Sequence, residues 1–175
     1  ADAPASAVPS TGLLVESAPA AAAVLVAGKL KGWTPVRLEG LKEGPHRVEL
    51  AAPWHEPVAQ EMKVVDRAVA RLLVPLKPLP FSQARGDAGR TGWQGRTADG
   101  ARQGAWVRYS EAGRRVEEAR YHKGARQGPY AAWDASGEVL RIAGAYRRGE
   151  PHGAWVSWSK DGSMAAGGWY VNGAL

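Results

Sequence analysis

The side chains that could support acid–base or metal chemistry in this sequence are four histidines and two adjacent acids. They are His46, His55, His122, His152, Glu117 and Glu118. A metal site needs several His, Cys or carboxylate ligands at characteristic short spacings, and the histidines have no such partners in the sequence. Glu117 and Glu118 fall on an expected strand, so they should point to opposite faces and cannot act as a pair of carboxylates. We therefore expect no metal site and no catalytic dyad.

Other catalytic signatures are missing as well. The sequence has no Cys, which excludes disulfides, thiol nucleophiles, iron–sulfur clusters and Cys-based zinc sites. It has no Gly-rich phosphate loop ahead of a helix, no His-x-x-x-His pair and no nucleophile elbow. We predict that the protein is not an enzyme and that it uses no cofactor.

The composition favours an all-β protein that makes contacts. The 175 residues include 22 Gly and 12 Pro, and so many turns between short apolar runs are typical of β-structure. The net charge of +6 is spread along the chain without a dense basic run, so we expect no specific nucleic-acid binding. The charge could still favour contact with an anionic surface.

Residues 1–10 are rich in Ala, Pro and Ser and contain neither a basic start nor a long apolar segment. This composition fits a flexible tether behind a removed signal peptide, and equally an ordinary disordered terminus. No stretch of the sequence approaches 18 apolar residues, so we expect no membrane-spanning helix.

Between residues 11 and 78, apolar residues alternate with polar ones in short runs that Gly and Pro separate. A period of two marks half-buried strands. Six or seven such strands in about 65 residues predict a small antiparallel β-sandwich or barrel. The alternating apolar positions are Leu13, Val15, Val24, Val26, Val36, Leu38, Val48, Leu50, Val58, Val64, Leu72 and Val74.

The order of motifs in this segment resembles a PEGA domain. That family combines Ser-x-Pro, a small-residue turn, a Val-x-Val strand, Gly-x-Thr-Pro and a Gly-x-His-x-Val strand before an aromatic residue. The corresponding residues are Ser17, Pro19, Val24, Val26, Gly28, Gly32, Thr34, Pro35, Leu41, Gly44, His46, Val48 and Trp54. The resemblance implies a β-sandwich of bacterial envelope or extracytoplasmic proteins that acts as a binding or spacer module. Residues 20–22, Ala-Ala-Ala, replace the family's Gly-Ala turn, and Ala adopts positive φ poorly.

The sequence leaves the positions of two tryptophans in this segment open. Trp33 and Trp54 could cap the sandwich core or stand exposed as anchors for a partner. Trp54 is therefore included among the candidate protein-binding residues. His46 is expected to be a structural strand residue.

After a Pro-, Gly- and Arg-rich linker at residues 79–91, an internal repeat occupies residues 92–175. Three complete units each combine three Gly positions with three aromatic positions, and a partial fourth unit stops after Gly173. The glycines are Gly100, Gly124, Gly149, Gly173; Gly104, Gly128, Gly153; and Gly113, Gly137, Gly162. The aromatics are Trp106, Tyr130, Trp155; Tyr109, Trp133, Trp158; and Tyr121, Tyr146, Tyr170. In the first unit, Thr97 occupies the position equivalent to these last three tyrosines.

Each unit predicts two antiparallel strands. Gly-x-aromatic-x-x-aromatic forms a first strand, a turn ending in a left-handed Gly follows, and a return strand ends at Tyr. We therefore expect a single-layer meander of β-hairpins. The two aromatics of a first strand are three positions apart, so either both faces of the sheet carry an aromatic row or a bulge turns both aromatics to one side.

The repeat resembles the variant of the MORN repeat that occurs in tandem in bacterial proteins, some of them antitoxin-like. The similar stretches are DGARQGAWVRY, KGARQGPYAAW, RGEPHGAWVSW and NGAL. The resemblance implies an array of β-hairpins used for contact with proteins or with membrane surfaces. It implies no particular site residue.

The repeat aromatics could simply form the core of the sheet, or they could form an exposed docking surface with Arg108, Arg126 and Arg147 nearby. The candidate protein-binding residues are Trp106, Tyr109, Tyr130, Trp133, Trp155, Trp158, Tyr170 and Trp54. The last expected strand, about residues 164–171, has no following repeat to cover it and could accept a strand from a partner.

These features predict a non-enzymatic, exported protein of the bacterial periplasm or cell envelope. It would be an accessory or structural subunit that docks through protein–protein contacts onto a larger assembly, such as a membrane-associated complex. Two alternatives remain open: binding of anionic lipid or a cell-surface polymer, and antitoxin-like binding of one protein.

Overall fold

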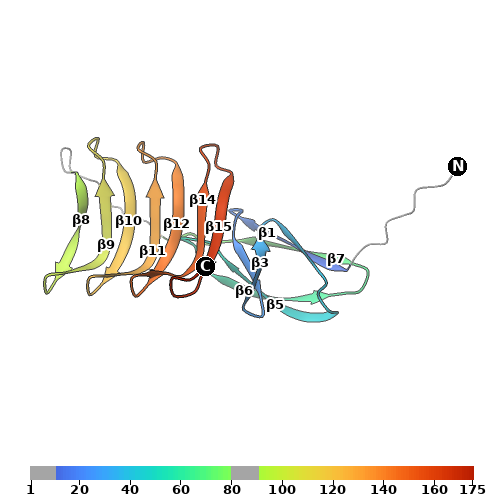
Figure 1. Cartoon of the computed structure of the whole chain (residues 1–175). Helices are drawn as coiled ribbons and strands as arrows, with labels where there is room; N and C mark the ends of the chain where they lie inside the picture. Colours follow the sequence, from blue (N-terminus) through green and yellow to red (C-terminus); the bar gives the residue numbers. More distant parts are fainter. Residues whose placement is uncertain (1–10, 80–90) are drawn as a thin grey trace. The chain divides into compact units, whose positions relative to one another are not determined.

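A computed structural model describes residues 11–79 and 91–175 of the chain (Figure 1). All regular elements in these two ranges are β-strands, which confirms the all-β prediction. The chain divides into two compact units. Unit 1 contains the described residues up to Leu50 together with Pro57–Leu76, and unit 2 contains Ala51–Glu56 and Lys77–Leu175. The predicted tether, residues 1–10, and residues 80–90 of the predicted linker lie outside the described residues.

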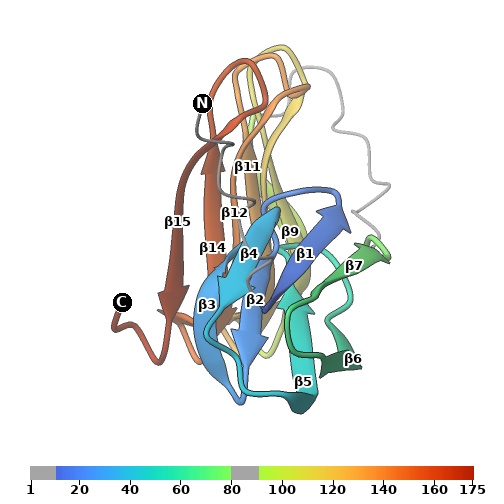
Figure 2. The same cartoon turned by 90° about the vertical axis from the view of Figure 1, so that its right-hand side faces the viewer.

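Unit 1 is a sandwich of two small sheets (Figure 2), with the strand orders β4-β1-β7 and β3-β2-β5-β6. We expected only antiparallel pairs, but β1 and β7 pair in parallel. The reason is that β6 and β7 belong to different sheets, so β7 reaches β1 by a crossover and not by a hairpin. The strands are β1 (Gly12–Ala18), β2 (Ala23–Val26), β3 (Lys29–Trp33), β4 (Val36–Glu39), β5 (Gly44–Ala51), β6 (Val58–Val64) and β7 (Val69–Pro75).

The core of unit 1 follows the apolar alternation of the sequence. Leu13 and Val15 of β1, Val24 of β2, and Val48 and Leu50 of β5 are all 0% exposed. Burial of one such aliphatic side chain stabilises a fold by about 1.5–3 kcal/mol. Both sheets of the sandwich therefore contribute to one apolar core.

The turn before β2 is held by the buried side chain of Thr34. Its hydroxyl lies 2.6 Å from the hydroxyl of Ser17, and it accepts a 3.0 Å hydrogen bond from the backbone N–H of Ala22. The N–H of Ala21 donates to the carbonyl of Thr34 at 2.8 Å. Ala21 has a φ of 65°, the left-handed conformation that Ala adopts poorly. The bonds to Thr34 thus hold Ala in a turn where the PEGA pattern has Gly.

The repeat region forms one antiparallel sheet in unit 2 (Figure 1), in the order β15-β14-β12-β11-β10-β9-β8, with the short β13 paired to β12. This is the predicted meander. The first strands of the repeats are β9, β11 and β14, and the return strands are β8, β10, β12 and β15. Their bounds are β8 (Gly92–Ala98), β9 (Ala101–Tyr109), β10 (Arg115–His122), β11 (Ala125–Trp133), β12 (Leu140–Arg147), β13 (Glu150–Pro151), β14 (Gly153–Trp158) and β15 (Met164–Tyr170).

The turns of this sheet repeat with the sequence. A return strand leads into the next first strand through two residues of positive φ, as in Lys123 (48°) and Gly124 (82°). These are the φ signs of a type I′ turn, whose twist matches that of paired strands. A first strand leads into its return strand through a turn in which the N–H of Gly113 donates to the carbonyl of Ser110 at 2.9 Å. Gly113 has a φ of 69°, which confirms the predicted left-handed Gly at the last turn position.

One face of the unit 2 sheet, which we call the buried face, excludes solvent. A row of side chains crosses five strands there, and each is at most 3% exposed: Val107, Glu118, Ala131, Ala143 and Val156. Trp54, in the segment Ala51–Glu56 of unit 2, packs on Ala131 and Ala143. Trp133 and Trp158 lie against the same cluster.

Candidate functional site

The opposite side of the unit 2 sheet carries two of the three aromatic series, and we call it the aromatic face. Its rings are those of Trp93, Trp106, Tyr121, Tyr130, Tyr146, Trp155 and Tyr170. The third series lies on the buried face and comprises Tyr109, Trp133 and Trp158. Of the two arrangements that the sequence left open, the sheet therefore has the one with aromatic residues on both faces. Ordinary strand alternation over three positions produces it.

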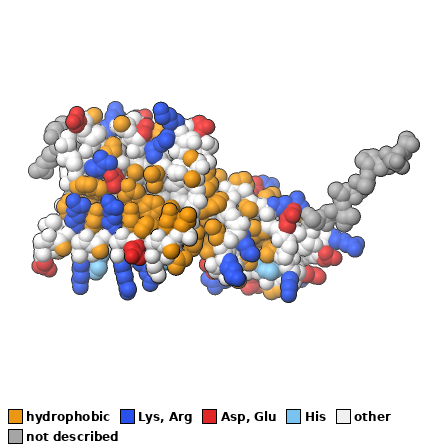
Figure 3. Space-filling view, in the orientation of Figure 1, with side chains coloured by type: hydrophobic (Ala, Val, Ile, Leu, Met, Phe, Trp, Pro, Cys, Tyr) orange, Lys and Arg blue, Asp and Glu red, His pale blue; other side chains and the backbone are white. Residues whose placement is uncertain are grey.

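The rings of the aromatic face contact one another in two groups. In the first group, Tyr121 makes edge contacts with Trp93 and Trp106 at ring-centroid distances of 6.5 and 6.2 Å. In the second, Tyr130 stacks on Trp155 at 5.5 Å, and further edge contacts extend the group to Tyr146 and Tyr170. The space-filling view shows hydrophobic side chains in a band across these strands, with Lys and Arg side chains beside it (Figure 3).

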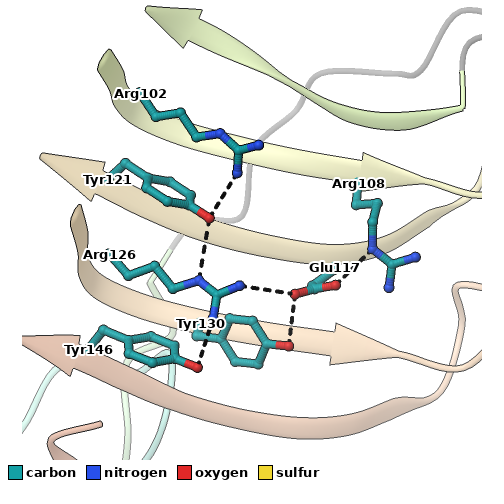
Figure 4. A network of polar contacts seen from close by, with 7 residues as sticks. All are labelled: Arg102, Arg108, Glu117, Tyr121, Arg126, Tyr130 and Tyr146. Carbon is teal, nitrogen blue, oxygen red and sulfur yellow. Dashed lines mark hydrogen bonds and ion pairs between the residues drawn. The ribbon is translucent and has the colours of Figure 1, made fainter. Parts of the chain in front are cut away.

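Arg126 of β11 joins the two groups of rings (Figure 4). Its Nε donates to the hydroxyl of Tyr121 at 3.3 Å, and its Nη1 donates to the hydroxyl of Tyr146 at 3.1 Å. The guanidinium also lies over the rings of Tyr130 and Tyr146, 5.7 and 5.0 Å from their centroids. The hydrogen bond to Tyr121 raises the pKa of Arg126 above its ordinary value. A permanent positive charge is thus fixed among the aromatic rings.

Glu117 of β10 is the acid of this network (Figure 4). Its carboxylate accepts a 2.9 Å hydrogen bond from the hydroxyl of Tyr130 and a 2.8 Å hydrogen bond from Nε of Arg108. Nη2 of Arg126 lies 4.0 Å from it. Burial, and after it the charge of Glu117, raises the pKa of Tyr130 above its ordinary value. The Tyr130 hydroxyl is therefore held neutral as a donor.

The contacts of Arg126 have a counterpart one repeat earlier. Nη1 of Arg102 donates to the hydroxyl of Tyr121 at 3.1 Å, and its guanidinium lies 4.5 Å from the ring centroid of Trp106. Both arginines belong to an Ala-Arg-Gln-Gly motif, and the Gln that follows Arg102 accepts a 2.9 Å hydrogen bond from the N–H of Lys123 in the next turn. From the sequence we assigned no contact role to Arg102, Glu117, Tyr121 or Tyr146. The signal that could have found the arginines is the recurrence of Ala-Arg-Gln-Gly.

The structure separates the eight candidate protein-binding residues. The aromatic face holds four of them: Trp106, Tyr130, Trp155 and Tyr170. Trp133 and Trp158 pack in the cluster on the buried face. Trp54 and Tyr109 are each only 4% exposed, so they are not available to a partner in this conformation. Trp54 therefore packs inside unit 2 and does not stand out as an anchor.

Small residues make room for the rings. A Cβ atom on Gly144 would lie 2.2 Å from the indole of Trp155, and one on Gly95 would lie 2.5 Å from that of Trp106. The indole Nε1 of Trp155 donates to the carbonyl of Ala145 at 3.0 Å. The rings therefore lie flat against the neighbouring strand, with their positions fixed by backbone contacts.

The histidines make local contacts. Nε2 of His46 lies 2.7 Å from the carbonyl oxygen of Lys42, and Nδ1 of His55 lies 2.8 Å from that of Pro53. Within residues 11–79 and 91–175, no group of three or more His, Asp or Glu side chains is arranged to hold a metal ion. The same residues include no helix that could cross a membrane.

Comparison with known proteins bears on the first part of the chain. The whole chain gives no match to a curated protein. PEGA domains are typically found in exported bacterial proteins. Residues 10–80 match the PEGA domain family.

Proposed function

We propose that this protein is a non-enzymatic interaction protein of the bacterial cell envelope, and that unit 2 is an array of MORN-variant repeats that docks onto a protein partner. The match of residues 10–80 to the PEGA domain supports an exported location. The proposal depends above all on one observation, the continuous aromatic face in which Arg126 links the two groups of rings.

The aromatic face has the composition of a protein-binding surface. Trp, Tyr and Arg are the residues that contribute most to binding energy at protein interfaces. Here the rings of Trp106, Tyr130 and Trp155 are only half-buried, so part of each remains open to a partner. Their ring contacts and the bonds of Arg126 hold them in place before binding, which lowers the entropy cost of association.

A photocrosslinking experiment tests the proposal in cells. Ile142 is 41% exposed and pairs with Ser157. It lies two residues before Gly144 in β12, so its side chain is also on the aromatic face. Arg120 is exposed and directly precedes Tyr121 in β10. Because Tyr121 points to the aromatic face, the side chain of Arg120 points to the opposite face of the sheet. We expect a photoreactive residue at position 142 to give one discrete protein adduct, and the matched residue at position 120 to give none. The proposal fails if neither position, or both equally, crosslink.

The adduct must then be verified as a specific partner. The crosslinked protein, once identified and purified, should bind the unmodified protein, and about 0.5 M salt should leave the complex intact because apolar contacts are not screened. Replacing Trp155 by Ser removes the central ring and should weaken binding at least about tenfold. The substitution Arg120→Ser, at an exposed residue, is the control and should leave binding unchanged.

A second function, binding to an anionic lipid surface or polymer, is favoured by a group of exposed cations. Arg120, Lys123, Arg147 and Arg148 lie near the type I′ turns, and no ion pair joins any of them to an acid in the described part of the chain. Each basic residue near an anionic membrane contributes about 1 kcal/mol. Vesicles with anionic phospholipid should then bind the protein at low salt and release it at about 0.5 M salt.

A further inference from the structure

Arg102 and Arg126 are equivalent residues of successive repeats, but only one of them has an acid beside it. Both donate a hydrogen bond to the hydroxyl of Tyr121, and both lie over aromatic rings (Figure 4). Nη2 of Arg126 lies 4.0 Å from the carboxylate of Glu117. No ion pair joins Arg102 to an acid within residues 11–79 and 91–175. In this part of the chain, the charge of Arg102 is therefore not balanced.

The register of the repeats explains this difference. Trp93 occupies in β8 the position that Glu117 occupies in β10. Likewise, Trp106 occupies in β9 the position of Tyr130 in β11, whose hydroxyl donates to Glu117. The indole Nε1 of Trp106 donates instead to a backbone carbonyl at 3.0 Å. The earlier repeat therefore has neither the carboxylate nor the hydroxyl group that holds it.

Aromatic rings fix the guanidinium group of Arg102 in place without neutralising it. Its central carbon lies 5.6, 4.5 and 5.2 Å from the ring centroids of Trp93, Trp106 and Tyr121. Nη1 donates to the Tyr121 hydroxyl at 3.1 Å, and the remaining N–H groups have no hydrogen-bond partner in the described part of the chain. Arg102 is only half-buried, so these N–H groups can be reached from outside. Their planar arrangement matches the two oxygens of a carboxylate.

A partner that covers the aromatic face removes the charge of Arg102 from water. Burial of an unpaired charge at an interface is costly, and a hydrogen-bonded carboxylate offsets much of that cost. Arg108 and Arg126 already share the carboxylate of Glu117. The position at which a partner has to supply an acid is therefore Arg102.

We propose that the protein partner carries an acidic side chain whose carboxylate binds the guanidinium group of Arg102, between the rings of Trp93 and Trp106; this site rests on the docking function proposed above. The carboxylate takes the place that Glu117 takes one repeat later. An apolar group beside it on the partner covers the ring of Trp106. An ion pair enclosed by rings is screened little by salt, so it agrees with a complex that survives high salt.

Removal of the charge at Arg102 tests the proposal, with the protein crosslinked at position 142 and then purified as the probe. We expect Arg102→Gln to weaken its binding at least about thirtyfold, because the acid of the partner is left unpaired. Arg120→Gln makes the same change on the opposite face and should leave binding unchanged; circular dichroism checks the fold of both variants. Absence of an adduct from the wild type overturns both proposals. An identified partner that binds Arg102→Gln as tightly as the wild type overturns only this one.

Two variants at position 93 separate the effect of charge from that of packing. Trp93→Glu and Trp93→Gln remove the same ring, and only the first places a carboxylate beside Arg102, as Glu117 is placed beside Arg126. The partner should bind Trp93→Glu at least about tenfold more weakly than Trp93→Gln, because its acid then meets a guanidinium group that is already paired. A partner in which that acid is replaced by Gln, found by scanning its acidic residues, should reverse the order. Equal affinity of the original partner for the two variants overturns the proposal.

Two further measurements distinguish a partner's acid from other anions. Asp87 is the only acid in residues 80–90, and the effects of Asp87→Asn and Arg102→Gln on unfolding free energy should be additive. Coupling between them would assign the carboxylate to this chain and overturn the proposal. Vesicles of phosphatidylglycerol and phosphatidylethanolamine should bind the wild type and Arg102→Gln alike. Loss of vesicle binding in Arg102→Gln, with unchanged binding of the protein partner, would assign the anion to a lipid headgroup and also overturn it.

Discussion

Glu117 and Glu118 are consecutive residues of β10, yet their carboxylates lie on opposite faces of one sheet. Glu117 bonds to Tyr130 and Arg108 on the aromatic face. Glu118 is 0% exposed on the buried face, 3.6 Å from Nη1 of Arg115. The two acids therefore cannot share a proton or a ligand, and each has a structural partner of its own.

Glu118 should contribute strongly to stability because a buried carboxylate is held by partners that its removal would leave unsatisfied. We expect Glu118→Ala to lower the free energy of unfolding by about 2–3 kcal/mol. The control is Glu138→Ala, which removes a 75% exposed carboxylate 3.5 Å from Arg114 and should change stability by less than about 0.5 kcal/mol. Urea unfolding followed by Trp fluorescence measures both. Equal effects of the two changes would contradict this prediction.

Arg126 should resist conservative replacement because its planar fork reaches two tyrosine hydroxyls at once. Arg126→Lys keeps the charge but cannot bond Tyr121 and Tyr146 together, so we expect a loss of about 1–2 kcal/mol in unfolding free energy. Arg147→Lys changes an exposed arginine and serves as the control, with an effect within about 0.5 kcal/mol. If Arg126→Lys is as stable as the wild type, Arg126 does not hold the two groups of rings together.

Gly144 should tolerate no side chain. A Cβ atom there would lie 2.2 Å from the Trp155 indole, so Gly144→Ala must displace the ring or the strand and should cost about 3 kcal/mol. Gly162 has a φ of 82° and nothing within 4 Å of its Cβ position, so a substitution there measures the cost of a positive φ without any steric clash. Gly162→Ala should cost about 1–2 kcal/mol. Thermal and urea unfolding check the order of the two variants.

Tyr130 should make stability depend on pH in the alkaline range. The pKa of its hydroxyl is higher in the folded protein than in the unfolded chain, where Tyr ionises at its ordinary pKa of about 10. The contribution of Tyr130 is therefore full below about pH 10 and is lost as the pH rises toward the folded-state pKa. Unfolding free energies measured between about pH 8 and 11 should fall less steeply for Tyr130→Phe than for the wild type. Parallel curves would contradict the prediction.

Replacing Ala27 should stabilise unit 1. It has a φ of 51°, it is exposed, and Gly28 follows it with a φ of 72°. Asn is favoured at the first central position of such a turn, whereas Ala is strained there. We expect Ala27→Asn to raise the unfolding free energy by about 0.5–1 kcal/mol. The same change at Ala59, an exposed residue inside β6, should not stabilise.

The all-β class and the hairpin meander were predictable from the sequence because both rest on local patterns. Apolar alternation defines the strands of unit 1, and the recurring Gly positions define the turns of unit 2, where Gly113 indeed takes a left-handed φ. These signals need no knowledge of distant contacts. The separation of Trp106 and Tyr109 onto opposite faces also follows from strand alternation, once a bulge between them is excluded.

The burial of Trp54 could not be predicted. Its contacts, Ala131 and Ala143, lie more than 70 positions away along the chain, and no local pattern indicates such a pairing. The role of Glu117, and the hydrogen bonds by which Arg126 joins two tyrosines, were not predicted for a related reason. Their geometry arises from neighbouring strands of different repeats, and a single unit contains only part of it.

The bond between Gln103 Oε1 and the N–H of Lys123, and its counterpart between Gln127 Oε1 and the N–H of Arg148, each tie one repeat to the next. Such an array depends on nearest-neighbour links, so a whole repeat can be duplicated or lost without changing the links that remain. Each gain or loss would lengthen or shorten the sheet by about 10 Å, the width of two strands. Duplication of a repeat can thus change the length of the sheet during evolution without requiring new kinds of contact between repeats.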